Sequence, residues 1–322
     1  MTSNKSNSLN TNQVQNLEVS EQFAGQRLDN FLLTRLKGVP KSHIYRIIRK
    51  GEVRINKKRC KPLQKLAQGD VVRIPPIRLS DASSAPDPSK AALETLEKSI
   101  IFEDKDLLII NKPSGFAVHG GSGVSYGVIE GFRVLRPRER RLELVHRLDR
   151  DTSGCLIMAK KTSVLRAFHE MIRNDEMEKY YLALLKGVMP DDEILVDQPL
   201  RKFVTKSGER MVKIDKEGKA SQTIFTVSRR FKNATLVDVK LLTGRTHQIR
   251  VHSLYLDQPI AGDDKYGDED FNKQMQTVGL KRLFLHAKRL KFRHPVSGEL
   301  MEPVAGLDKE LTEVISKLGN ES

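Results

Sequence analysis

The sequence predicts an α+β protein of two domains, a small basic N-terminal domain and a larger domain built on a mixed, largely antiparallel sheet with flanking helices. In residues 96–322, strand and helix patterns mix without the regular alternation that marks a parallel sheet. Residues 81–95 (DASSAPDPSKAALET) have the composition of an exposed linker. The charge is also uneven, because residues 21–80 hold 15 Lys and Arg against 4 Asp and Glu in a chain of net charge +15. A localised positive charge is typical of a separate module that binds a polyanion.

The composition favours a folded protein of the cytoplasm. The chain has 322 residues, 38% of them hydrophobic, which is enough to bury a substantial core. It contains no run of eighteen apolar residues, and residues 1–20 are polar without the apolar segment of a secretory signal, which predicts a disordered tail. Cys60 and Cys155 lack the spacing of a zinc site or a disulfide framework. We therefore expect no membrane partner.

The basic domain, residues 21–80, is predicted to follow the order helix, helix, strands. RLDNFLLTRL places apolar residues at helical spacing, and KSHIYRIIRKG predicts a second, short and basic helix that ends at a glycine. EVRIN and VVRIP then predict two short strands. This order, with the stretches GQRLDNFL, VPKS and GEVRIN, resembles the S4 RNA-binding domain.

The cationic residues of the basic domain are its candidates for RNA binding. They would present donors to phosphates from adjoining elements, which is the part of RNA recognition that does not depend on sequence. These residues are Arg27, Lys41, Arg46, Arg49, Lys50 and Arg54. The alternative is that they form the solvated charged face of an ordinary helical hairpin.

The larger domain carries its most informative motif between two predicted core strands. VHRLDRDTSG, residues 145–154, sets Asp149 between two arginines and ends in turn-forming residues. The apolar stretch LELV precedes it and CLIMA follows it. The motif is therefore either a plain turn or a turn that holds a nucleophile.

The residue pattern argues against several common chemistries. The histidines are scattered and neither HExxH nor paired cysteines occur, so we expect no metal. A serine hydrolase would place its serine in a GxSxG turn, which is absent, and a glycosidase would need two cooperating carboxylates. One carboxylate near an arginine is a different design, a nucleophile that needs no metal. TGRTHQIRVH supplies His247 and Arg250, which would share a face on a helix, and we expect His146 and His247 to act as hydrogen-bonding scaffold.

Four motifs together resemble those of the RluA-type pseudouridine synthases. In chain order they are NKPSG, VHRLDRDTSG, MEKYYLALL and LLTGRTHQIRVH. The resemblance extends from about residue 21 to about residue 305 and includes the S4-like domain in front. It is greatest to the branch of the family that modifies large-subunit ribosomal RNA, and it implies the pseudouridine synthase fold for residues 96–322.

The resemblance also implies roles for four residues. Asp149 would be the catalytic aspartate, which attacks the target uridine at either the base or the ribose. Tyr181 would stack against the target base, Arg250 would pair with Asp149, and Arg147 would help to displace the nucleotide from its stack. Strand geometry agrees in part, because Tyr180 and Tyr181 point to opposite faces and only one can face a site. The alternatives are a turn residue at Asp149, a core residue at Tyr181 and a structural arginine at Arg250.

The expected reaction is the isomerisation of specific uridines to pseudouridine without cofactor or metal. It breaks the C–N glycosidic bond, rotates the uracil and joins its C5 to the ribose, so the base must first leave its RNA context. The expected partner is large-subunit (23S) ribosomal RNA or an assembly precursor of the ribosome, and we expect a monomer. Two alternatives stay open: a non-catalytic protein that binds ribosomal RNA or assists ribosome assembly, and an RNA N-glycosidase that releases free uracil.

Overall fold

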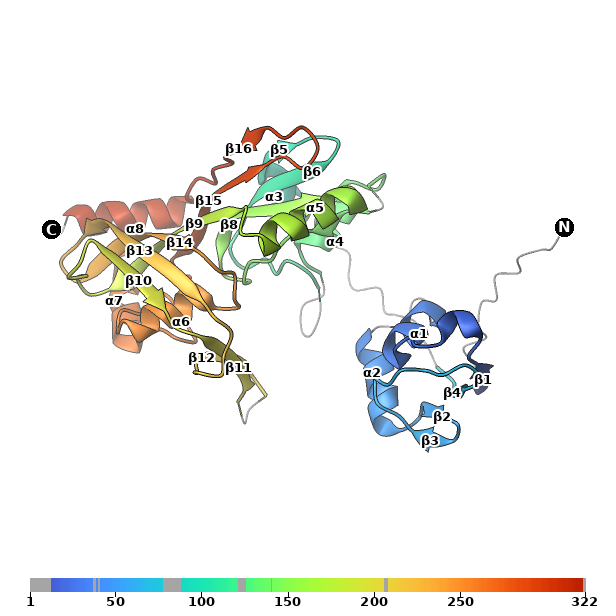
Figure 1. Cartoon of the computed structure of the whole chain (residues 1–322). Helices are drawn as coiled ribbons and strands as arrows, with labels where there is room; N and C mark the ends of the chain where they lie inside the picture. The colour runs from blue at the N-terminus through green and yellow to red at the C-terminus, as the bar shows by residue number, and fades with distance from the viewer. Residues whose placement is uncertain are drawn as a thin grey trace. The chain divides into compact units, whose positions relative to one another are not determined.

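The chain forms two units, which are described separately. The structure, a computed structural model, describes residues 13–36, 39, 41–77, 88–120, 126–139, 141–205 and 208–320. The first unit is Met1–Ala85 and the second is Pro86–Ser322; both are drawn in Figure 1. Within the described ranges, no helix combines the length and the apolar character that a membrane span requires.

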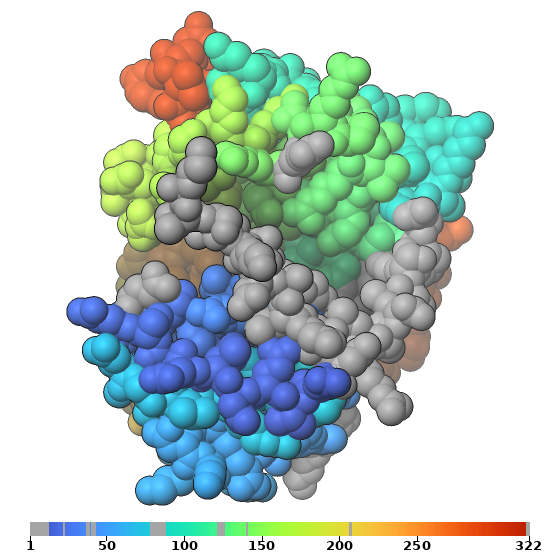
Figure 2. All heavy atoms as spheres, turned by 90° about the vertical axis from the view of Figure 1, so that its right-hand side faces the viewer, coloured from blue at the N-terminus to red at the C-terminus, as the bar shows by residue number. Residues whose placement is uncertain are grey.

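The small unit packs two helices against a four-stranded sheet, and from residue 28 onward its elements follow the predicted order of helix, helix and strands. The helices are α1 (Leu28–Arg35) and α2 (Lys41–Lys50), preceded by the 3-10 helix η1 (Glu21–Phe23). In spatial order, the strands are β1 (Gln15–Glu18), β4 (Val71–Ile74), β2 (Arg54–Ile55) and β3 (Lys58–Arg59). Apolar side chains from both helices and the sheet form one core, enclosed by the surface coloured blue to cyan in Figure 2.

Two structured segments lie where the sequence predicted none. Strand β1 falls in the predicted tail, residues 1–20, and pairs antiparallel with β4 while Leu17 packs on the core. Helix α3 (Lys90–Lys98) falls in the predicted linker, residues 81–95, where the Ser89 hydroxyl accepts from the Ala92 N–H at 3.2 Å. For these residues the predictions were wrong, because one short edge strand and one capped helix carry too few apolar residues to stand out. Residues 1–12 and 81–87 of the two predicted segments lie outside the described residues.

The large unit is built on one ten-stranded sheet. Eight strands follow the order β10-β13-β14-β9-β15-β8-β6-β5, while β16 pairs with β15 and β7 with β8. The described pairs are antiparallel except β15 with β8, which confirms the predicted mixed, largely antiparallel sheet. The strands are β5 (Ile100–Glu103), β6 (Leu107–Lys112), β7 (Glu143–Leu144), β8 (Ser153–Ala159), β9 (Glu178–Lys186), β10 (Glu193–Asp197), β13 (Gln222–Arg230), β14 (Ala234–Leu241), β15 (Leu285–Arg293) and β16 (Leu300–Met301).

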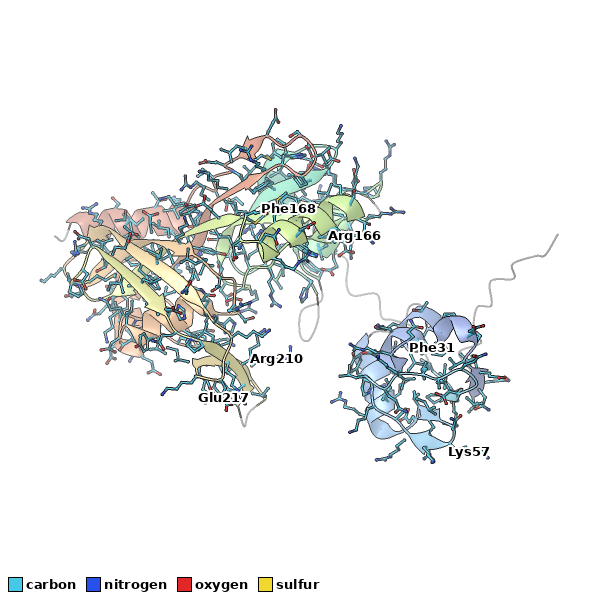
Figure 3. The ribbon with its side chains drawn as sticks, in the orientation of Figure 1. Phe31, Lys57, Arg166, Phe168, Arg210 and Glu217 are labelled. Atoms are coloured by element: carbon cyan, nitrogen blue, oxygen red, sulfur yellow. The ribbon has the colours of Figure 1, made fainter. Side chains whose placement is uncertain are left out.

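Helices cover both faces of this sheet. On β9, Tyr181 and Ala183 belong to the core of one face, while Leu182 and Leu184 belong to a core on the other. The first face packs against α3, α4 (Val128–Leu135) and α6 (Gln248–Tyr255). The cores of the second face include α5 (Thr162–Arg173), α7 (Glu269–Thr277) and α8 (Lys309–Asn320). Figure 3 labels Phe168, which anchors α5.

A two-stranded hairpin projects from the large unit. It consists of β11 (Leu200–Val204) and β12 (Arg210–Ile214), paired antiparallel, and is seen at the lower edge of this unit in Figure 1. Arg210, labelled in Figure 3, stands at the start of β12. Val212 and Leu200 of the hairpin form a small core with Val251 of α6, so the hairpin is seated on the helix that follows β14.

Candidate active site

The predicted catalytic motif is a loop between two strands of the sheet. It leaves β7 and enters β8, and the Thr152 N–H donates to the Asp149 carbonyl at 3.2 Å to close a turn. Gly154 lies at φ 111°, and a Cβ there would lie 2.3 Å from the Ala287 carbonyl oxygen of β15. The glycine of the motif is therefore what allows β8 and β15 to pair so closely.

The NKPSG motif fixes the backbone of this loop. The Lys112 ammonium is fully buried and donates to three carbonyl oxygens, including that of Arg150 at 2.9 Å. The Gly115 N–H donates to the same Arg150 carbonyl at 3.0 Å, and the Ser114 hydroxyl donates to the Asp151 carbonyl at 2.8 Å. Burial lowers the pKa of Lys112 to about 7, although the negative charge of Asp151 raises it in part. The segment just after Asp149 is thus held by buried donors from a distant motif.

A buried histidine ties the end of the loop to β15. Ser153 Oγ lies 2.8 Å from His286 Nδ1, and Arg282 Nη2 donates to the same hydroxyl at 3.0 Å. His286 Nε2 lies 2.9 Å from the Ala305 carbonyl oxygen, so Nε2 carries the ring proton and Nδ1 accepts from Ser153. The serine of the motif is a structural anchor.

His146 ties the start of the loop to β8. Its Nε2 accepts a hydrogen bond from the Ile157 N–H at 3.2 Å. Burial, together with the nearby charge of Lys179, lowers the pKa of His146 to about 4, so the ring is neutral at pH 7. A neutral acceptor is the scaffold role that the sequence predicted for this histidine.

Asp149 faces a buried arginine. Arg250 Nη1 lies 3.5 Å from Asp149 Oδ2, and the Asp149 side chain is 21% exposed. Asp263 holds Arg250 from behind, accepting from its Nε at 2.7 Å and from its Nη2 at 2.6 Å. Burial lowers the pKa of Arg250, but the hydrogen bonds and charge of Asp263 raise it by more, so the guanidinium stays charged. Arg250 therefore reaches Asp149 as a fixed cation.

Asp263 was not predicted from the sequence to belong to the site. Its carboxylate is buried and also accepts from the backbone N–H groups of Lys265 and Tyr266, at 2.9 and 3.0 Å. Burial raises the pKa of this carboxyl, but the Arg250 guanidinium and the two N–H groups lower it by more. The available signal was the stretch AGDDKYG, in which an acidic pair follows a glycine. That stretch alone does not tell which of Asp263 and Asp264 turns inward.

His247 is a second group beside Asp149. Its Nε2 lies 3.7 Å from Asp149 Oδ2, and its Nδ1 lies 2.8 Å from the Tyr266 hydroxyl. That hydroxyl accepts from the Val212 N–H at 2.9 Å, so its own proton is directed to Nδ1 and the imidazole Nε2–H faces the carboxylate. Burial lowers the pKa of His247 by more than the negative charge of Asp149 raises it, so the neutral ring is favoured. His247 sits before α6 at φ 54°, so it reaches Asp149 from the helix start and not from the predicted helical face.

Tyr181 lies on the central strand β9 and lines the same cavity as Asp149. It is 8% exposed and packs in the core of the α6 face. Burial and the charge of Asp149 raise the pKa of its hydroxyl, so it is a neutral phenol. Tyr180 points to the opposite face, where the Arg289 guanidinium lies 4.2 Å from its ring centroid. Of the two tyrosines, Tyr181 is thus the one that faces the site.

The cavity has a volume of about 430 Å³, which is in the range of small-molecule sites. Its apolar wall is formed by Val145, Leu148, Ile172, Tyr181, Leu241, Ile249 and Leu285. Its polar wall includes Asp149, Thr152, His169, Arg173, Lys179, Arg245, His247 and Arg250. An apolar wall that includes an aromatic ring, next to one carboxylate and several cations, can accept a planar base attached to an anionic backbone.

The two arginines of the motif separate. Arg147, predicted to contact the RNA, is exposed and lines the cavity beside Asp149. Arg150 is 60% exposed, and its Nε lies 3.1 Å from the neighbouring Asp151 carboxylate. Of these two arginines, Arg147 is the one placed to meet a ligand in the cavity.

The RNA-binding candidates of the small unit also divide. Arg46, Arg49 and Lys50 share an exposed face of α2, and Arg54 lies exposed on β2. Arg27 is engaged in a structural contact: its Nη2 lies 2.5 Å from the buried carboxylate of Asp29, to which the Tyr45 hydroxyl also donates. Lys41 begins α2, and its side chain lies outside the described residues.

One group of possible metal ligands lies among the described residues. Asp104, Asp106 and His294 place their ligand atoms within 4.8 Å of one another, in a second cavity that shares no lining residue with the first. Two backbone N–H groups donate to His294 Nδ1, so its Nε2 carries the proton and donates to Asp104 Oδ2 at 3.1 Å. Lys161 donates to Asp106 at 2.6 Å. Since both nitrogens of His294 are already used, this group does not fit a metal.

Two family models match the chain. The model for RNA pseudouridylate synthase matches residues 106–255, and the model for the S4 domain matches residues 26–72. Both agree with the two folds that the motifs predicted. Asp149, Tyr181 and Arg250 all lie in the first matched range.

Relatives match along nearly the whole chain. The Ribosomal large subunit pseudouridine synthase C of Pasteurella multocida (strain Pm70) is 54% identical over 306 residues, which is 95% of this chain and 94% of the relative. The protein of the same name from Escherichia coli (strain K12) is 54% identical over 313 residues, 96% and 98% of the two chains. Among solved structures, Human RNA Pseudouridylate Synthase Domain Containing 4 matches with a TM-score of 0.59 at 26% identity, covering 71% of this chain and 96% of that one.

Proposed function

This chain belongs to the RNA pseudouridylate synthase family, and on that premise we propose that it converts specific uridines of large-subunit (23S) ribosomal RNA into pseudouridine with Asp149 as its nucleophile. The alternative of a non-catalytic RNA-binding protein is not favoured. The observation that carries the assignment of the site is the meeting of Asp149, Tyr181 and Arg250 in one cavity. They come from a loop, a strand and a helix that are distant in the sequence.

The reaction moves one bond within the substrate. The glycosidic bond between N1 of uracil and the ribose breaks, the uracil rotates, and a bond from C5 to the ribose forms. The proton on C5 leaves and N1 gains one, so the reaction needs no oxidant or reductant. Asp149 would attack the target uridine, at its base or at its ribose, and leave again when the new bond forms.

The neighbours of Asp149 prepare it for this step. The Arg250 guanidinium, fixed by Asp263, orients the carboxylate from 3.5 Å. The neutral His247 directs its Nε2–H toward the same oxygen from 3.7 Å, and without substrate it transfers no proton to Asp149. Tyr181 gives the uracil a ring to stack on while it rotates. The base reaches this cavity only when it is out of its RNA stack, and Arg147 at the rim would take its place.

The small unit would supply affinity for the RNA. Arg46, Arg49 and Lys50 on α2 and Arg54 on β2 are exposed cations that suit phosphate contacts. Arg27 supports them by holding Asp29, and through it Tyr45 of α2. We place the enzyme in the cytoplasm, because its proposed substrate is ribosomal RNA or an assembly precursor. We also propose that it acts as a monomer.

Asp149→Asn tests the proposed chemistry. The amide has nearly the same shape but is a poor nucleophile, so pseudouridine formation in a ribosomal RNA transcript should fall by at least about 1000-fold. RNA affinity, measured by filter binding or fluorescence anisotropy, should stay close to that of the wild type. Asp151→Asn is the matched control, since this neighbouring carboxylate pairs with Arg150 and does not line the cavity.

The outcomes distinguish the alternatives. Full activity in Asp149→Asn would refute the role of Asp149 as the nucleophile. No pseudouridine from the wild type, with strong RNA binding, would favour a non-catalytic RNA-binding protein. Free uracil together with an abasic RNA would identify an N-glycosidase, because an isomerase keeps the base in the chain.

A further inference from the structure

The cations on the two faces of strand β9 differ in whether they have carboxylate partners. On the face away from the cavity, Lys240 lies 2.7 Å from Glu178, and Arg289 lies 3.1 Å from Glu302. Lys288 pairs with Asp238 at 2.7 Å. The cations on this side thus have carboxylate partners, the ordinary state of a structural surface.

Lys179 has no such partner. It stands on β9 between β14 and β15, opposite Leu241 and Leu290, and it is partly buried. Among the described residues, no hydrogen bond or ion pair of its ammonium is found. An ammonium drawn out of water without a partner costs free energy, and burial lowers its pKa by more than the charge of Asp175 raises it. Such a cost is retained where a ligand supplies the partner.

Lys179 lies on the same face as Tyr181. Residues two apart on a strand point the same way, with Cα atoms roughly 7 Å apart, and both residues line the cavity. A base stacked on Tyr181 therefore leaves the sugar-phosphate part of its nucleotide within reach of the Lys179 side chain. No other nearby part of the substrate offers a full negative charge.

The rest of the cavity wall favours an anion as well. The lining contains Arg147, Arg173, Lys179, Arg245 and Arg250 against the single carboxylate of Asp149. Arg250 is tied to Asp263, and Arg245 donates to a backbone carbonyl at 3.1 Å. Within the described part of the chain, the side chains of Arg147 and Arg173 make no hydrogen bond or ion pair, and His169 lies one turn before Arg173 on α5. The guanidinium groups of Arg147 and Arg173, together with Lys179, are the cations available to a ligand.

We propose that Lys179, in a cavity wall that also carries Arg147 and Arg173, binds a backbone phosphate of the RNA next to the uridine that enters the cavity. The proposal rests on the proposed function, because it names the part of the same substrate that holds the flipped nucleotide in place. Arg147 and Arg173 are exposed and add charge, whereas Lys179 supplies the inner contact. The phosphate contact fixes the nucleotide while the uracil is free to rotate on Tyr181.

A chemical double-mutant cycle tests this contact. The probe is a fragment of large-subunit ribosomal RNA that the wild type binds and that contains a single candidate uridine. A second version carries a neutral methylphosphonate at the phosphate on the 5′ side of that uridine, and a third carries it on the 3′ side. Each is assayed for kcat/KM and for affinity with the wild type, Lys179→Met and Lys179→Arg. Lys186→Met is the control, since Lys186 lies on the same strand but pairs with Asp268 outside the cavity.

We expect the losses of kcat/KM from the protein variant and from the methylphosphonate not to add, because both changes remove the same contact. Lys179→Met should lower kcat/KM on unmodified RNA by about 10- to 100-fold, the value of a hydrogen bond to a charged group. One of the two methylphosphonates should lower the wild-type value by a similar factor and the Lys179→Met value by less than about twofold further. Lys179→Arg should recover most of the loss, and Lys186→Met should stay near the wild type. The melting temperature of Lys179→Met should not fall, because an unpaired ammonium is removed.

Two results would overturn the proposal. In one, both methylphosphonates reduce Lys179→Met and the wild type by the same factor, which would mean that Lys179 contacts no phosphate. In the other, Lys179→Met loses stability and activity together while Lys179→Arg recovers neither, which would make Lys179 a structural residue. The affinity measurements separate this proposal from the proposed function. If the wild type forms no pseudouridine but its affinity still depends on a phosphate contact with Lys179, only the proposed function is contradicted.

Discussion

Asp263→Asn should lower both stability and activity, although Asp263 does not line the substrate cavity. The Asp263 carboxylate is fully buried and takes both the Nε and the Nη2 hydrogen bonds of Arg250, at 2.7 and 2.6 Å. The amide keeps the shape but removes the charge and turns an NH2 group toward the guanidinium. Arg250 is then a buried cation that has lost its main partner.

The size of the effect follows from that burial. Breaking a buried ion pair by removing one partner costs about 3–5 kcal/mol. In a domain of this size, such a loss lowers the melting temperature on the order of 10 °C. Catalysis should also fall, because Arg250 would no longer be held 3.5 Å from Asp149. Asp264→Asn is the matched control: this neighbour is 73% exposed and 3.5 Å from Arg250, so its loss should cost less than about 1 kcal/mol.

The pH dependence gives a second measurement on the same variants. The pKa of Asp263 is lowered in the folded state, so its contribution to stability is present above the ordinary carboxyl pKa of about 3.9 and is lost as the pH falls below it. Thermal or urea unfolding at several pH values should therefore show a gap between the wild type and Asp263→Asn that is constant near neutrality and closes in acid. Equal losses from Asp263→Asn and Asp264→Asn at pH 7 would refute this reasoning.

Two further predictions concern the loop anchor and the small unit. Lys112→Met should leave three buried carbonyls without their donor and lower both stability and activity. Because the pKa of Lys112 is lowered to about 7, the lysine binds fewer protons in the folded than in the unfolded protein between about pH 7 and pH 10.4. The stability of the wild type relative to Lys112→Met should therefore rise with pH across this window, as urea titrations can measure. A flat difference across that window would contradict the buried position of its ammonium. Removing residues 1–80 should weaken RNA affinity and flatten its dependence on salt by roughly 0.7–0.9 units of logarithmic slope per lost phosphate contact; equal slopes for the two proteins would show that the small unit makes no such contacts.

Much of the fold was predictable because its strands are strongly apolar and bounded by turns. The runs LLIIN, CLIMA and YYLALL became the buried strands β6, β8 and β9, and Gly154 marked a real constraint on the backbone. Strand β1 and helix α3 were missed because their apolar content is small and their stability comes from a partner strand and a helix cap. Local pattern carries no information on such tertiary support.

The site was predictable only as far as motifs name residue types. VHRLDRDTSG and TGRTHQIRVH pointed to Asp149 and Arg250, but no local rule shows that they lie 3.5 Å apart. Three buried partners escaped notice because their roles arise from long-range packing: Lys112 under the loop, His286 beside Ser153, and Asp263 behind Arg250. A lysine in a turn motif gives no sign, from sequence alone, that its ammonium will be fully buried.

The most direct measurement is a map of pseudouridines in large-subunit ribosomal RNA from cells that lack this protein. We expect that a specific set of pseudouridines is missing, that the wild-type protein restores it, and that Asp149→Asn does not, although the variant still binds the RNA. An unchanged map in the deletion strain, or full restoration by Asp149→Asn, would contradict the central claim.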